Sequence, residues 1–165
     1  MKDVAVHGSN IVEVIKPGHV TYTRQVYRDT DTCIDWNEEA KKCNEYEKAW
    51  MNAGSFSTGA KITGTVLAPS SKLQVQGKNV AKVGDKTNET WIAFPPIPSN
   101  TTDTRYVSVQ PARSGSGQGE IIGGSSKGNL GPTSRVALIG SLVKTCLEGT
   151  TTTIADGNTK MNFSS

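Results

Sequence analysis

The chain has 165 residues and a mass of 17.6 kDa, which is the size of one ordinary domain. Hydrophobic residues make up 35% of it and aromatic residues 6%, so the composition argues against a large helical core and against an enzyme with a deep apolar pocket. The net charge of +3, without a run of five basic residues, predicts no nucleic-acid partner. No apolar stretch approaches the roughly 20 residues of a membrane-spanning helix, and residues 1–10 lack the pattern of a secretory signal.

Short strands joined by turns are expected in residues 1–32. Apolar residues there are separated by Gly8-Ser9-Asn10 and by Lys16-Pro17-Gly18. Gly, Pro and Asn are the usual residues of turns between short strands. The sequence therefore predicts two breaks in this region, one at each of the two turn sequences.

One amphipathic helix is predicted between Asp35 and Gly54. Trp36, Cys43 and Trp50 are spaced so that they would share one helix face. Asp35 suits the N-cap, and Gly54 suits the residue that ends a helix. We expect the two tryptophans of this face to lie in the core.

The cysteines fit neither a disulfide framework nor a zinc ribbon, because Cys33, Cys43 and Cys146 are an odd number without a C-x-x-C pair. A Cys33–Cys43 disulfide requires Cys33 to lie outside the helix and fold back on it. We therefore expect Cys43 to be a buried thiol on the apolar helix face.

From Ser55 onward the pattern is again that of strands. Leu73 to Val83 predicts a hairpin with a turn at Gln76-Gly77-Lys78-Asn79. The Pro-rich segment Trp91–Pro98 predicts an extended loop. The Gly- and Ser-rich segment Ser114–Gly131 predicts either a flexible tip or a tight series of turns.

The hairpin pattern recurs later in the chain. SSKLQVQGKNVAKVGD begins at Ser70, TSRVALIGSLVKTC begins at Thr133, and GNTKMNF begins at Gly157. All three share a polar start, a basic residue and an alternating strand, and the two longer ones add a Gly turn and a returning strand. Such a repeat indicates one unit copied so that the copies bury a shared face.

The first copy resembles the signature of PAAR-repeat proteins, which reads approximately GSPxVxxNGxPAARxGD. Ser70-Ser71 stand at the opening, Gly77-Lys78 at the turn and Gly84-Asp85 at the closing Gly-Asp, while Asn79 to Lys82 replace Pro-Ala-Ala-Arg. The second copy lacks the Gly-Asp pair. The residues that carry the resemblance are Ser71, Val75, Gly77, Val80, Ala81, Lys82, Gly84, Asp85, Val136, Gly140 and Met161.

The resemblance implies a mainly β fold, a small cone of repeated hairpins with pseudo-threefold symmetry, to which the N-terminal helix is an addition. Residues 1–53 would extend the same domain. Residues 54–165 would form the repeat region, with a long insertion at about 91–130.

The resemblance also implies a structural role and no enzymatic one. Family members cap a trimeric β-helical spike, one tip per trimer, in phage tails, type VI secretion systems and related injection particles, and pierce the target cell envelope. The protein would then lie in a virion tail baseplate or an extracellular injection particle, assembled in the bacterial cytoplasm, without a small-molecule substrate. The alternative function is a β-rich carbohydrate-binding or adhesion module that uses Trp36, Trp50 or Trp91.

Many members of this family hold zinc or iron near the point through His and Cys. The soft ligands available here include Cys146, His7 and His19, and no His follows His19. The sequence leaves two alternatives open, a zinc or iron ion on these residues or no cofactor. Lys72, Lys78, Lys82 and Lys86 could protect strand edges or meet acidic groups of a partner.

Overall fold

The computed structural model describes residues 1–129 and 134–163, and these form two compact units. The first unit contains Met1–Pro17, Ala60–Ile92 and Ser114–Ser165, and the second contains Gly18–Gly59 and Ala93–Arg113. The strands are β1 (Lys2–Val4), β2 (Val14–Asn37), β3 (Lys42–Leu67), β4 (Gln74–Val75), β5 (Lys78–Asn79), β6 (Lys86–Phe94), β7 (Thr104–Gln110), β8 (Ser114–Ile121), β9 (Leu142–Lys144), β10 (Thr151–Thr153) and β11 (Asn158–Phe163). The mainly β class is therefore confirmed, and no helix occurs among the described residues.

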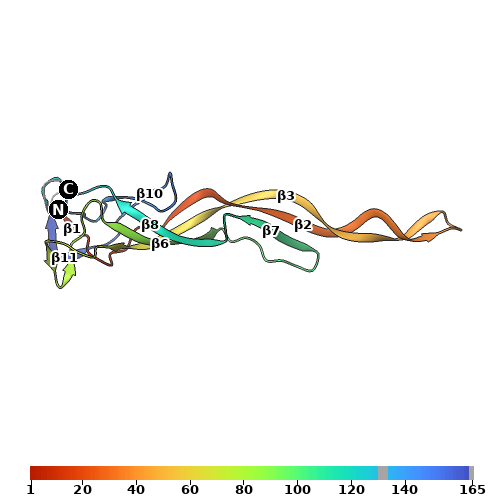
Figure 1. Cartoon of the computed structure of the whole chain (residues 1–165), viewed down its shortest axis with the longest axis horizontal. Coiled ribbons are helices and arrows are strands. Elements are labelled where there is room, and N and C mark those ends of the chain that lie inside the picture. Colours follow the sequence, from red (N-terminus) through yellow and green to blue (C-terminus); the bar gives the residue numbers. More distant parts are fainter. Residues whose placement is uncertain (130–133, 164–165) are drawn as a thin grey trace. The chain divides into compact units, whose positions relative to one another are not determined.

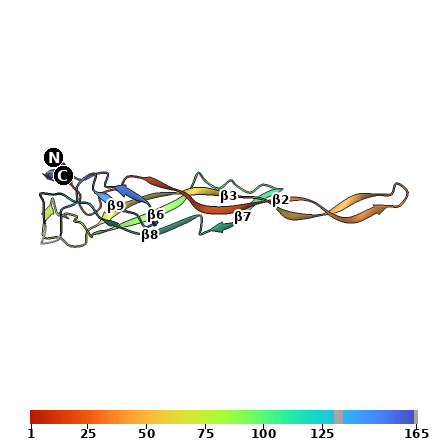
Figure 2. The same cartoon turned by 90° about the horizontal axis from the view of Figure 1, so that it is seen from above.

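The first unit joins strand pairs side by side. Its hydrogen-bonded neighbours follow the order β10-β9-β8-β6-β3. The pairing is antiparallel between β6 and β8, between β8 and β9, and between β9 and β10. Two further antiparallel pairs, β4 with β5 and β1 with β11, lie at one end of this unit together with both chain termini (Figures 1 and 2).

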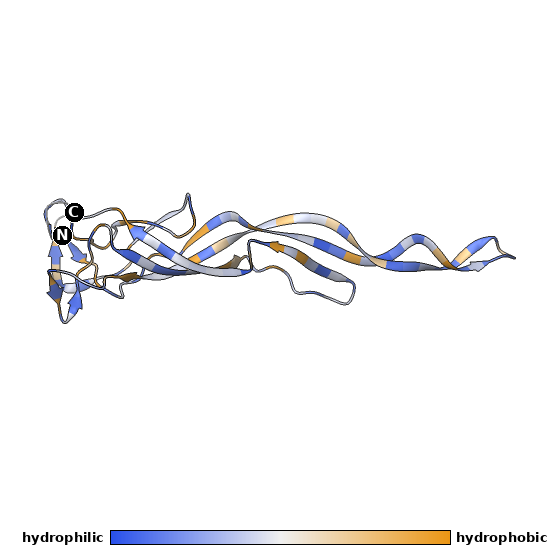
Figure 3. Cartoon of the chain, in the orientation of Figure 1, coloured by the Kyte–Doolittle hydropathy of each residue, from blue (hydrophilic) through white to orange (hydrophobic). Residues whose placement is uncertain are grey.

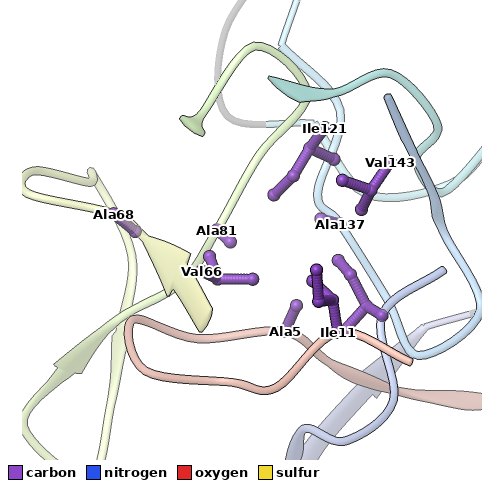
Figure 4. Close-up of a cluster of buried hydrophobic side chains, with 9 residues drawn as sticks. Ala5, Ile11, Val66, Ala68, Ala81, Ile121, Ala137 and Val143 are labelled. Carbon is purple, nitrogen blue, oxygen red and sulfur yellow. The ribbon is translucent and has the colours of Figure 1, made fainter. Parts of the chain in front are cut away.

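Two apolar clusters form the core of the first unit. One holds Ala5, Ile11, Val66, Ala68, Ala81, Ile121, Ala137, Val143 and Ile154, whose side chains converge from several segments (Figure 4). The other holds Val4, Val6, Val75, Val80, Val136 and Leu138, with Leu73, Met161 and Phe163 packed against it. Most of the buried members of the two clusters are Ala or Val, and none is aromatic, so many short segments build the core rather than a few bulky residues.

The second unit is a ribbon of β2 and β3 with β7 on the outer edge of β2. Strand β7 pairs with Thr21–Val26, and Tyr27 N–H also donates to Asp103 O at 2.8 Å. Hydrophilic residues alternate with isolated hydrophobic ones along the ribbon (Figure 3). A two-stranded ribbon offers little surface for burial, which explains why Ile34 and Trp36 are more than half exposed.

The predicted helix over residues 35–54 is wrong. These residues form the end of β2, a turn at Glu38–Lys41 and the start of β3. Ala40 N–H donates to Asn37 Oδ1 at 2.9 Å, and Lys41 adopts a left-handed φ of 54° in this turn. Cross-strand contacts override the helical spacing of the apolar residues, because the spacing along one segment does not record its pairing across the turn with the preceding strand.

The Cys33–Cys43 disulfide joins the two strands of this ribbon near the turn, with a Cα–Cα distance of 5.9 Å. The expectation of a buried free thiol at Cys43 is therefore wrong. Trp36 is 52% exposed and does not belong to the core. Trp50 is half-buried, because its ring lies 5.3 Å from that of Tyr27 and the Arg105 guanidinium lies 4.3 Å from its centroid.

Two further local predictions fail because the strands are longer than the turn residues suggested. Lys16-Pro17-Gly18 lies within β2, where Gly18 takes a φ of +69° and the strand continues. Trp91–Phe94 is the end of β6, with Trp91 and Ala93 buried and the residues between and after them exposed. The turn predicted at Gly8-Ser9-Asn10 does occur.

Strand β8 forms in residues 114–121, the first part of the segment 114–131 for which a flexible tip or a series of turns is predicted, whereas residues 122–129 are mostly irregular with a bend. Several positions of β8 must be glycine, because neighbouring atoms leave no room for a Cβ. A Cβ on Gly115 would lie 2.7 Å from the Trp91 ring, and one on Gly117 would lie 2.8 Å from Cys146 Cβ. The side chains of partner strands therefore occupy the space that glycine leaves, and they order a segment whose composition opposes order. Residues 130–133 lie outside the described part.

Gly119→Ala should destabilise the first unit. The added methyl group would collide with the Glu89 carboxylate and lie 2.5 Å from Lys144 O. Overpacking a filled site costs roughly 1–3 kcal/mol, so urea denaturation should show a lower free energy of unfolding by about that amount. Ser116→Ala, at an exposed position of the same strand, is the matched control. Equal stability of the two variants would contradict this account of β8.

Candidate functional site

Three short segments of the first unit share one sequence pattern and one backbone pattern. They are Val4–Ser9, Val80–Asp85 and Val136–Ser141, and each reads Val-Ala-x-x-Gly followed by Ser or Asp. We call them the hub segments. Their alanines form a closed ring, in which Ala5 N–H donates to Ala137 O, Ala137 N–H to Ala81 O, and Ala81 N–H to Ala5 O, at 2.8–2.9 Å. One chain thus closes a ring of three equivalent hydrogen bonds around a single axis.

Each hub segment then turns through its glycine in the same way. Gly8, Gly84 and Gly140 have φ values of 91°, 97° and 86°. Their N–H groups donate to Val66 O, Ile121 O and Ile154 O, the last residues of three returning segments, at 2.8–2.9 Å. A positive φ favours glycine strongly, so this position is set by the backbone.

The residue after the glycine closes each turn with its side chain. Ser9 Oγ accepts from Val6 N–H at 3.0 Å, Asp85 Oδ2 from Lys82 N–H at 3.0 Å, and Ser141 Oγ from Leu138 N–H at 2.9 Å. Asp85 also forms an ion pair with Lys82 Nζ at 2.9 Å. Ser and Asp therefore accept the same hydrogen bond in these turns. Gly140-Ser141 stands in the second copy where the first copy has Gly84-Asp85.

Strand-like alternation explains the composition of the hub segments. The alanines face one apolar cluster, whereas Val4, Val80 and Val136 face the other. The third positions of two segments, Val6 and Leu138, join the second cluster as well. Lys82 stands at the corresponding position of the middle segment, where its charge is balanced by Asp85.

Each hub segment is preceded by one member of a strand pair at the end of the first unit. The three pairs are β1 with β11, β4 with β5, and the bridge between Asn129 and Arg135. We call them the end pairs. The residues just before the hub segments accept equivalent bonds, with Asn79 O taking His7 N–H, Arg135 O taking Val83 N–H, and Asp3 O taking Ile139 N–H. The ends of the chain thus form the third end pair together.

The structure places most of the predicted signature residues in the hub or in these end pairs. Ser71 Oγ accepts from Leu73 N–H at 3.2 Å, Gly77 forms the β4–β5 turn with φ of 78°, and Val75 and Met161 belong to or pack on the second apolar cluster. Val80, Ala81, Lys82, Gly84, Asp85, Val136 and Gly140 lie in hub segments. Thr133, the start of the second copy, lies outside the described residues.

Sequence reasoning missed the hub segment at Val4. The turn Gly8-Ser9 was treated as a separator between strands, and the third copy was placed at Gly157 instead. That segment lies in β11, which pairs with β1 directly before Val4. The signal that finds the missing copy is the recurrence of Val-Ala-x-x-Gly with Ser or Asp at three places in the chain.

The residues named as metal ligands do not form a ligand group. No three His, Cys, Asp or Glu side chains among the described residues are arranged to hold an ion. The exposed His7 uses Nδ1 to accept from Ala68 N–H at 3.0 Å, and His19 belongs to the second unit. Among the described residues, Cys146 and Glu89 are not accompanied by a third His, Cys, Asp or Glu placed to hold an ion with them.

Cys146 lies beside a buried carboxylate. Glu89 is 2% exposed, accepts from the Thr87 hydroxyl, and its Oε1 accepts from Cys146 N–H at 2.8 Å. Burial, followed by the hydrogen bond and the charge of Glu89, raises the pKa of the Cys146 thiol from 9.0 to about 11. The Glu89–Cys146 hydrogen bond connects β6 to the segment after β9.

Comparison with known proteins gives no relative. No protein-family model matches the chain, and no curated protein and no solved structure is significantly similar to it.

Ser9→Ala and Ser141→Ala should destabilise the protein by similar amounts, because each removes the acceptor of one equivalent hub turn. A buried N–H group without an acceptor costs about 1–3 kcal/mol. Urea denaturation of both variants, with Ser116→Ala as an exposed control, measures the effect. A large loss in one hub variant and none in the other would contradict the equivalence of the hub segments.

Cys146 should react slowly with iodoacetamide in the folded protein. A thiol pKa raised by about two units leaves roughly 100-fold less thiolate at pH 8 than in the unfolded chain. Alkylation without reductant, followed by mass spectrometry, reports on this free cysteine alone. The rate should rise strongly in denaturant and moderately in Glu89→Gln. Equal rates in folded and denatured protein would show that the site does not protect the thiol.

Proposed function

We propose that this protein caps the end of a trimeric β-helical spike, as the tip of a contractile tail or injection machine that pierces a target cell envelope. The observation that carries the proposal is the closed ring of Ala5, Ala81 and Ala137. A single chain arranged around a threefold axis can offer each of three identical chains an equivalent surface. One copy of this protein can then contact all three chains of the trimer equivalently and cap its end.

The end pairs are the surface that we expect to contact the spike. The β1–β11 and β4–β5 pairs lie at one end of the first unit (Figure 1), and with the Asn129–Arg135 bridge each belongs to one of the three hub repeats. A trimeric β-helix ends in three exposed strand edges, and exposed edges invite uncontrolled pairing. Three short strand pairs arranged around one axis are suited to cover them.

The resemblance to PAAR-repeat proteins supports the class of partner. The strongest match, Val80–Asp85, forms a complete hub segment, and Lys82 occupies the place of the arginine in the family signature. The role is mechanical and requires no catalytic residue. Assembly in the bacterial cytoplasm and final location in a virion tail or an injection particle belong to the same proposal.

A second candidate function is an adhesion module that binds glycans, and the exposure of Trp36 favours it. This side chain is 52% exposed in the ribbon of the second unit. Aromatic faces on an exposed ribbon are suited to stack on sugar rings. Trp91 does not support this function, because it is 6% exposed.

Native mass spectrometry of the chain, co-expressed with the β-helical protein encoded nearest to it in its source genome, tests the main proposal. We expect a complex of three spike chains and one copy of this protein, because one pseudo-threefold chain can occupy only one spike end. Ala81→Asp, which places a charge at the buried ring, should abolish capping by disrupting the hub. Trp36→Ala should leave the complex intact.

A bare spike trimer beside free, folded protein would reject capping. Glycan-array binding that is lost in Trp36→Ala would then support the adhesion function.

A further inference from the structure

The end pairs carry a symmetric set of exposed basic side chains. Each pair has two, on its strands or within two residues of them: Lys2 and Lys160 at β1–β11, Lys72 and Lys78 at β4–β5, and Lys127 and Arg135 at the Asn129–Arg135 bridge. All six are exposed. Each of the three end pairs thus carries two exposed basic side chains.

These six side chains make no ion pair within the described part of the chain. Other lysines of the first unit do have carboxylate partners. Lys82 pairs with Asp85 at 2.9 Å, and Lys86 pairs with Glu120 at 3.2 Å. The chain therefore neutralises basic residues in the hub and along β6 but leaves those of the end pairs available.

Acidic groups at the same end do not balance this charge. Asp3 is half-buried in β1. Asp156 accepts from Asn10 N–H at 2.9 Å and from Asn10 Nδ2 at 2.8 Å. By sequence position, the end pairs carry six basic residues against two acidic ones, Asp3 and Asp156, both on or beside β1–β11. The positive excess therefore resides at β4–β5 and at the Asn129–Arg135 bridge.

An apolar cluster lies between these charges. Leu73, Met161 and Phe163, which are half-buried, pack against Val4, Val75 and the other members of the second cluster. Partly exposed apolar side chains surrounded by polar ones are typical of a protein interface. A free strand edge protected by lysines would not need such a centre.

We propose that the end pairs dock on an acidic end face of a threefold protein, in which each of three identical chains presents carboxylates to one end pair. This inference rests on the proposed function and adds the charge of the partner surface to it. Two exposed basic side chains in each of the three repeats match three identical chains, whereas a nucleic acid or a membrane would not require the threefold pattern. Charge complementarity would set the register and steer association, while the apolar centre would supply buried area.

The test uses the full chain and the β-helical trimer encoded nearest to it, with the dissociation constant measured by isothermal titration calorimetry at 50 and 500 mM NaCl. The variant Lys78→Glu/Arg135→Glu/Lys160→Glu changes one residue of each end pair. The control Lys42→Glu/Lys48→Glu/Lys144→Glu changes the overall charge by the same amount at exposed positions outside the end pairs. Thermal unfolding verifies that both variants remain folded.

We expect the end-pair variant to raise the dissociation constant about tenfold or more at 50 mM NaCl, since three surface ion pairs become three repulsive contacts. The control should bind like the wild type, and salt should weaken wild-type binding more than binding of the end-pair variant. Binding by the wild type that is unaffected by both the substitutions and salt would overturn the acidic docking surface while leaving capping intact. Failure of the wild type to bind the trimer would overturn both.

Discussion

The closed ring of hydrogen bonds between Ala5, Ala81 and Ala137 is the constraint on which the rest of the first unit depends. Three backbone segments can approach one axis this closely only with small side chains at the meeting point. The ring also fixes the direction of the segments that enter and leave it. Each hub segment therefore turns at its glycine before the next strand begins. The N–H of each of these glycines donates to a carbonyl group of the segment that leads back to the hub.

The repeats share this hub but differ in the strands that extend from it. Strands β9 and β10 form a short pair, β6 and β8 form a longer one with β7 inserted between them in sequence, and β2 and β3 are the longest. Adding residues to a strand pair costs little free energy once the hub has fixed the register of that pair. The hub thus accounts for threefold order near the axis and for large differences between repeats away from it.

A buried, hydrogen-bonded carboxylate in the first unit helps to hold these repeats together. The Glu89 carboxylate is held by Thr87 and by the backbone of Cys146, in space that Gly119 leaves free. A buried carboxylate is stable only when its oxygens are hydrogen-bonded. The group joins neighbouring repeats and raises the pKa of the Cys146 thiol.

Residue types alone determined the features whose cause is local. The positive φ required of Gly8, Gly84 and Gly140, and the acceptor that follows each of them, can be found by comparing three short stretches of sequence. The β4–β5 turn at Gln76-Gly77 was predictable for the same reason, because two residues with positive φ close a tight hairpin. Closure of the third repeat by β1 and β11 was not, since it joins the two ends of the chain.

Only the tertiary structure decided which segments pair with one another as strands. The spacing of Trp36, Cys43 and Trp50 fits a helix, yet the Cys33–Cys43 bond and the contacts of Tyr27 and Arg105 with Trp50 hold a ribbon. The glycines of β8 indicate disorder by themselves, and the Trp91 ring and its neighbours supply the order. The sequence determined the turn that each hub segment makes, because this turn needs nearby atoms alone, whereas the alanine ring and the strand pairing depend on partners that no local pattern identifies.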